Sequence, residues 1–162
     1  MALLLAAVVV TAGVARGDDP KSAPAPDLQL VWTEGEISLD MSLTTTEITV
    51  TGTKLHYHRR YSGRNAGFPG TKPLDLDARI KDPRKLRDAI AALDKVPVKK
   101  VAAAPDDRAP YSGPYTEGCV TRGKVVRCGV RREGDSESAE LKAIAAIRDV
   151  LADGLKLDPF GP

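Results

Sequence analysis

The two cysteines of this chain, Cys119 and Cys128, lie symmetrically about the dipeptide Gly123-Lys124. If that dipeptide forms a two-residue turn, Cys119 pairs directly with Cys128 across the hairpin. Cross-strand pairs alternate between hydrogen-bonded and non-hydrogen-bonded positions, and the cysteines fall on a non-hydrogen-bonded pair, where the strands come within disulfide reach. The spacing therefore predicts a disulfide within a single β-hairpin.

The N-terminal residues have the pattern of a secretory signal peptide. An apolar run begins at Leu3, and small residues follow it up to Gly17, which suits cleavage before Asp18. The apolar stretch ends at Ala15, short of the roughly 20 residues that cross a bilayer, so we expect no stable membrane anchor. We expect residues 1–17 to be removed on export to the periplasm or the extracellular space, where disulfides persist.

Residues 18–27 are polar and rich in proline, which predicts a flexible tether because this composition cannot bury apolar surface. Residues 28–162 have the length of a single domain. Lys and Arg number 24 against 22 Asp and Glu, and aromatic residues make up only 4% of the chain. Nucleic-acid binding is therefore excluded, because it needs a basic surface with stacking side chains.

Alternating apolar residues predict a first β-hairpin at the start of the domain. A turn at Glu34-Gly35 would place Trp32 opposite Ile37 on one apolar face. The same register would pair Leu30 with Leu39 and Leu28 with Met41.

A second hairpin is predicted about Gly52-Thr53. It would pair Val50 with Leu55 on the apolar face and Thr49 with His56 on the polar face. A further strand over residues 74–80 alternates apolar and charged side chains, so we expect one buried face and one solvent-exposed face.

Two amphipathic helices are predicted to cover the apolar face of the sheet. Asp82-Pro83 supplies an N-cap and a proline at the first helical position, and this helix ends before Pro97. Ser136 is expected to cap a second helix, whose apolar stripe runs from Leu141 to Leu155. The predicted fold class is α+β: an antiparallel meander sheet with two amphipathic helices packed on one face, plus the disulfide-bridged β-hairpin.

Both histidines of the chain lie in one predicted strand, at positions that point to the same side as Arg60. Asp75 and Asp77 share one face of the later strand in the same way. If the polar faces of the two strands match, we expect His58 to lie opposite Asp77 and Arg60 opposite Asp75. His56 completes this polar patch.

Two imidazoles and two carboxylates on one surface would suit a divalent metal such as zinc. Arg60 and Arg79 lie in the same patch, and their positive charge disfavours a cation. We therefore expect no metal and no cofactor, and we interpret the patch as a solvated face with cross-strand charge pairs. The arginines favour a small anionic ligand or an acidic partner surface.

A glycine-rich segment from Tyr61 to Lys72 joins these two strands. It lacks the order of a phosphate-binding P-loop, because Gly70-Thr71-Lys72 leads through a proline into a strand and not into a helix. We expect a long hairpin loop in which Tyr61, Arg64 and Phe68 contribute to binding, since aromatic residues with an arginine are typical of contact hot spots.

Nucleophilic catalysis finds little support in the sequence. Ser62 and Ser112 each precede a glycine, but neither lies in a Gly-x-Ser-x-Gly motif. The symmetric placement of Cys119 and Cys128 favours a structural disulfide over a reactive thiolate. We assign no catalytic residue, and an enzyme is the less favoured class.

These patterns predict an exported binding module that uses the histidine strand and the Tyr61–Lys72 loop to engage an unknown protein or small anionic ligand, in the cell envelope or outside it. The layout of strands and helices resembles small secreted bacterial modules that include protease inhibitors. This resemblance implies an alternative, inhibition through an exposed loop at residues 64–70 or 109–115. A second alternative is a hydrolase or metal-dependent enzyme that uses four side chains of the patch: His56, His58, Asp75 and Asp77.

Overall fold

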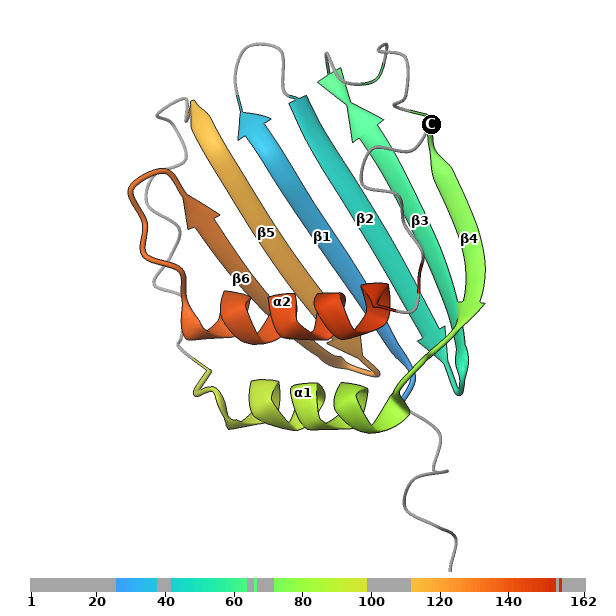
Figure 1. Cartoon of the computed structure of the whole chain (residues 1–162). Helices are drawn as coiled ribbons and strands as arrows, with labels where there is room; N and C mark the ends of the chain where they lie inside the picture. The colour runs from blue at the N-terminus through green and yellow to red at the C-terminus, as the bar shows by residue number, and fades with distance from the viewer. Residues whose placement is uncertain are drawn as a thin grey trace, which may run out of the picture.

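The computed structural model describes residues 26–37, 42–63, 66, 72–98, 112–153 and 155 of the chain. In these ranges, six strands form one antiparallel sheet in the order β4-β3-β2-β1-β5-β6, and two helices lie across one of its faces (Figure 1). The fold is therefore α+β, with the helices on one face, as predicted. The elements are β1 (Leu28–Ile37), β2 (Ser42–Thr51), β3 (Lys54–Ser62), β4 (Leu74–Arg79), α1 (Pro83–Lys95), β5 (Gly113–Arg122), β6 (Val125–Arg132) and α2 (Ala139–Ala152).

The hydrophobic core lies between the helices and the sheet. Leu30 on β1 and Ile48 on β2 have no exposed surface, and Leu86 of α1 is equally buried. Burial of each such side chain is worth about 1.5 to 3 kcal/mol relative to exposure, so this layer is the main source of stability. The predicted apolar stripe of the second helix is buried throughout its length, at Leu141, Ile144, Ile147, Leu151 and Leu155.

β5 and β6 form the predicted cysteine hairpin. Gly123 has a φ of 57° in the turn, a left-handed conformation that glycine adopts without steric cost. The register pairs Cys119 with Cys128, their Cα atoms lie 4.1 Å apart, and their sulfur atoms are bonded. The predicted disulfide is therefore confirmed.

The predicted hairpin about Glu34-Gly35 is wrong, because both residues lie inside β1. Trp32 pairs with Thr46 of β2 and not with Ile37. The alternating apolar residues of β1 find their partners further along the chain, since Leu28 pairs with Val50 and Leu30 with Ile48. The other predicted partners, Leu39 and Met41, lie outside the described residues.

β2 and β3 pair about Gly52-Thr53 as predicted, with Val50 opposite Leu55. Gly52 has a φ of 60°, which again favours glycine in a tight turn. The backbone N–H of Gly52 also donates to Asp27 Oδ1 at 2.8 Å. The last residue before β1 is thus fixed to the β2–β3 turn.

The first helix begins as predicted and the second does not. The Asp82 side chain accepts hydrogen bonds from the backbone N–H groups of Arg84 and Lys85, at 3.1 and 3.0 Å, and caps α1. Ser138, and not Ser136, caps α2, because its Oγ accepts from the Leu141 N–H at 3.1 Å. Both serines suit a cap, and apolar periodicity does not fix a helix start to within two residues.

α2 lies very close to β6. A Cβ atom at Gly129 would come within 2.6 Å of the Leu141 backbone nitrogen. Arg127 donates from Nε to Glu140 Oε1 at 2.5 Å and from its guanidinium to the Val96 carbonyl at 2.9 Å. These contacts join β6, α2 and the end of α1. Neither described helix is long and apolar enough to cross a membrane.

Candidate functional site

Both helices lie on one face of the sheet, and no described helix covers the opposite face, which we call the open face (Figure 1). Side chains alternate between the two faces along each strand, so the strand register assigns every position to one of them. The open face carries the histidine patch at its β3–β4 end and the disulfide at its β5–β6 end. Its central side chains are Gln29, Val31, Thr33, Thr45, Glu47, Thr49, Glu117, Cys119 and Thr121.

The predicted pairing across β3 and β4 is wrong by two residues. His56 lies opposite Asp77 and His58 lies opposite Asp75, whereas the sequence predicted His58 opposite Asp77 and Arg60 opposite Asp75. The predicted faces were correct, because a shift of two residues keeps every side chain on its own face. Polar alternation alone therefore could not fix the offset.

His56 is the centre of a four-residue network. Its Nδ1 lies 2.9 Å from Asp77 Oδ1, and its Nε2 lies 3.2 Å from Asp75 Oδ1. His58 Nδ1 lies 3.1 Å from the second oxygen of Asp75. A neutral imidazole has only one N–H group, so two carboxylate contacts favour the doubly protonated imidazolium of His56.

The environment of His56 also favours its protonated form. The hydrogen bond to Asp77, together with the negative charges of Asp77 and Asp75, raises the pKa of His56 above its usual value of 6.5, against a smaller opposing effect of burial. About half of the His56 side chain is exposed. The network is thus a solvated patch that favours the protonated form of His56 and is accessible to a partner.

Arg60 does not contact the aspartates. Its guanidinium lies 2.9 Å from Glu47 Oε1 on β2, and the two residues lie on the same face. Among the described residues, no group of three or more His, Cys, Asp and Glu side chains is arranged to hold a metal ion. The aspartates instead serve as hydrogen-bond acceptors for the histidines.

A hollow of about 560 Å³ adjoins His56 at the end of the sheet formed by the β2–β3 turn and β4. Thr49, Thr51 and Asp77 line it together with two cations, Lys54 and Arg79. The sequence reasoning did not single out Lys54. Its position opposite Arg79 depends on the β3–β4 register, which polar alternation leaves open.

The remaining predicted binding residues do not join this patch. Tyr61 lies on the helix side of β3, where the guanidinium of Arg59 lies 5.6 Å from the centre of its ring. Arg64 and Phe68 lie outside the described residues, and so does most of the predicted loop. The predicted inhibitory loop at 64–70 falls largely outside them, and the one at 109–115 falls only partly outside them, since Gly113–Tyr115 belongs to β5.

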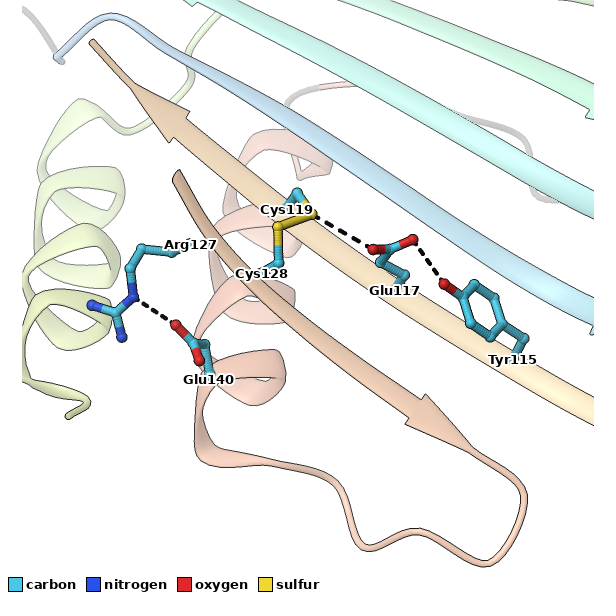
Figure 2. The surroundings of a disulfide bond; sticks show 6 residues. All are labelled: Tyr115, Glu117, Cys119, Arg127, Cys128 and Glu140. Atoms are coloured by element: carbon cyan, nitrogen blue, oxygen red, sulfur yellow. Dashed lines mark hydrogen bonds and ion pairs between the residues drawn. A yellow bond between two sulfur atoms is a disulfide. The ribbon is translucent and has the colours of Figure 1, made fainter. Parts of the chain in front are cut away.

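The disulfide lies on the open face, close to Glu117, which lies on β5 two residues before Cys119 (Figure 2). Glu117 Oε1 lies 3.9 Å from Cys119 Sγ, and Oε2 accepts a hydrogen bond from the Tyr115 hydroxyl at 2.8 Å. Partial burial and this hydrogen bond raise the pKa of Tyr115 to about 12. Both cysteines are oxidised, so neither is available as a thiolate nucleophile.

A second polar site, which sequence reasoning missed, lies on the helix side of the sheet. Trp32 and Arg148 line a cleft of about 360 Å³, with the Arg148 guanidinium 4.2 Å from the centre of the Trp32 ring. Trp32 Nε1 donates to Glu34 at 2.8 Å. Arg59 also lines the cleft, and its buried Nε has no hydrogen-bond partner among the described residues.

One sequence signal could have indicated this cleft. Arg59 follows Leu55 and Tyr57 at the same alternating positions of β3, so a cation occupies an otherwise apolar face.

Comparison with protein-family models, curated proteins and solved structures finds no match.

Proposed function

We propose that the chain is an exported binding module without a catalytic role, and that it binds its ligand on the open face at the end formed by β3 and β4. The observation that carries this proposal is the position of the His56 network. Four interacting polar side chains lie on paired strands of a sheet face that no described helix covers. Groups on a rigid scaffold lose little conformational freedom on binding, which favours recognition.

The chemistry of the network fits binding better than nucleophilic catalysis. Within the described residues, each polar side-chain contact of His56 and His58 is to an aspartate oxygen. A catalytic base needs a hydroxyl or thiol within reach, and the contacts of the described residues include none at either imidazole. Export is supported by the apolar N-terminal run and by the disulfide, since disulfides persist in oxidising compartments.

The test compares the two sides of the molecule with the same introduced side chain. Thr45 lies near the middle of the open face, beside Thr33, whereas Ala92 lies on the exposed surface of α1. The wild-type chain, Thr45→Arg and Ala92→Arg are immobilised and exposed to envelope extract and culture medium. Mass spectrometry then identifies the retained proteins and small molecules.

We expect a ligand that the wild-type chain and Ala92→Arg retain and that Thr45→Arg loses. Circular dichroism spectra and melting curves establish that both variants are folded. Retention that is equal in all three chains, or that is lost only in Ala92→Arg, would show that the open face is not the binding surface.

A further inference from the structure

Lys54 of β3 and Arg79 of β4 lie directly opposite each other on the open face, and both are exposed. Like charges at directly opposed positions of an antiparallel pair repel each other. Within the described ranges, neither side chain has an ion pair or a hydrogen bond. The neighbouring position of the same two strands pairs His56 with Asp77 instead, so the repulsion is confined to the end of the sheet.

The two cations line a hollow on this side of the sheet with a volume of about 560 Å³. Thr49 and Thr51 line it as well, and their hydroxyl groups are further hydrogen-bond donors. Asp77 is the one carboxylate among the described residues of its wall, and it already accepts from His56 Nδ1 at 2.9 Å. The described lining thus combines two cations that have no ion-pair partner with neutral donors and with one carboxylate that already contacts His56.

We propose that this hollow binds a dianionic oxyanion group, of the phosphate or sulfate type, between Lys54 and Arg79. The proposal rests on the proposed function, because it names the ligand class for the same end of the open face. The guanidinium can donate two parallel hydrogen bonds to such a group, and the ammonium supplies a compact positive charge. A bound dianion would convert the repulsion between the cations into attraction.

The charge of His56 affects how tightly this hollow binds an anion. Asp77 lies opposite His56, Asp75 contacts its Nε2, and Thr49 faces it from β2. Protonation of His56 offsets the negative charge of Asp77, which would otherwise repel an anion. Binding is therefore tighter at acidic pH.

The experiment measures anion binding to the folded chain by isothermal titration calorimetry at constant ionic strength, because salt screens such contacts. Sulfate is the main probe, since its charge does not change between pH 5.5 and pH 8 under these conditions. Inorganic phosphate is a second probe and malonate is a dicarboxylate probe, and the three anions are compared at pH 8, where all of them are predominantly dianions. Lys54→Gln and Arg79→Gln remove one cation each. Arg60→Gln is the matched control, because Arg60 lies on the same face and is neutralised by Glu47.

We expect one sulfate per chain, bound more tightly at pH 5.5 than at pH 8. Loss of one charged hydrogen-bond donor should weaken binding roughly tenfold in Lys54→Gln and Arg79→Gln, while Arg60→Gln binds as the wild type does. Without the anion, Lys54→Gln should melt at a higher temperature than the wild type, because the repulsion is relieved. Sulfate should raise the melting temperature of the wild type more than that of this variant.

Equal sulfate affinity in the wild type and Arg79→Gln, or no binding at millimolar sulfate and pH 5.5, would overturn the proposal. Tighter binding of malonate than of both oxyanions would also overturn it, in favour of a dicarboxylate ligand. If sulfate does not bind but the retention experiment still depends on Thr45, the ligand class is wrong and the open face remains the binding surface. If sulfate binds as expected and retention does not depend on Thr45, the proposed anion site is supported. The proposal that the ligand binds on the wider open face is then wrong.

Discussion

The Arg148 guanidinium of α2 lies over the ring of Trp32 on β1, 4.2 Å from its centre. Trp32 is the only tryptophan in the chain, so its fluorescence reports the contact between helix and sheet. A cation over an aromatic face contributes about 0.5 to 1 kcal/mol at partly exposed positions. We expect Arg148→Met to lower the free energy of unfolding by about this amount and to change the Trp32 emission. Arg84→Met, on the exposed surface of α1, should change neither quantity.

The close approach of α2 to β6 gives a second prediction. Gly129→Ala should lower the free energy of unfolding by about 1 to 3 kcal/mol, because the added methyl group would meet the Leu141 backbone and α2 would have to move. Urea denaturation measures the change. Truncation of the Leu141 side chain cannot relieve an overlap with its backbone nitrogen. A Gly129→Ala/Leu141→Ala double variant more stable than Gly129→Ala would therefore contradict this explanation.

The disulfide gives a third prediction. Cys119 and Cys128 are nine residues apart in sequence, and the chain-entropy estimate for so short a loop is roughly 2 to 3 kcal/mol. The turn already restricts the unfolded hairpin, so the measured loss should lie at or below this range. Cys119→Ala/Cys128→Ala should still fold, with a lower melting temperature, and should bind sulfate as the wild type does. A double variant that melts like the oxidised wild type would show that the bond is not a stabilising one.

The raised pKa of His56 gives a fourth prediction, about pH. The folded chain holds this proton more tightly than the unfolded chain, whose histidines titrate near 6.5. The stabilisation is therefore complete below pH 6.5 and is lost as the pH rises through the folded-state pKa of His56. Nuclear magnetic resonance titration of the imidazole should give a pKa above 6.5, and Asp77→Asn should lower it. A wild-type value at or below 6.5 would reject the network as described.

The hairpins about Gly52 and Gly123 could be predicted because each turn is short and symmetric pairing follows from it. Symmetric pairing about Gly35 was a wrong prediction, because this position requires glycine for another reason. A Cβ atom there would overlap the backbone oxygen of Ser42 on β2, so the glycine allows two strands to approach and does not form a turn. Sequence alone does not distinguish these two uses of glycine.

Two features of the candidate sites could not be predicted from the sequence: the offset between paired strands and the contact of α2 with β1. Alternation placed His56 on the open face correctly but left its partner open, because shifts of two residues preserve the face. The pairing of Lys54 with Arg79 depends on that same offset. The Trp32 cleft depends on the position of α2 over β1, a tertiary relationship that periodicity within one element does not contain.

The central position of β1 has a consequence for how the chain folds. β1 pairs on one side with β2, which follows it closely, and on the other side with β5, which begins only at Gly113. During synthesis the N-terminal strands can pair early, but one edge of β1 stays unpaired until the distant β5 is available. Contacts between such remote segments slow folding, and an open edge strand can pair with another chain in the meantime. The sheet is thus completed in a late step that involves the whole domain, and the incomplete chain is the form most exposed to aggregation.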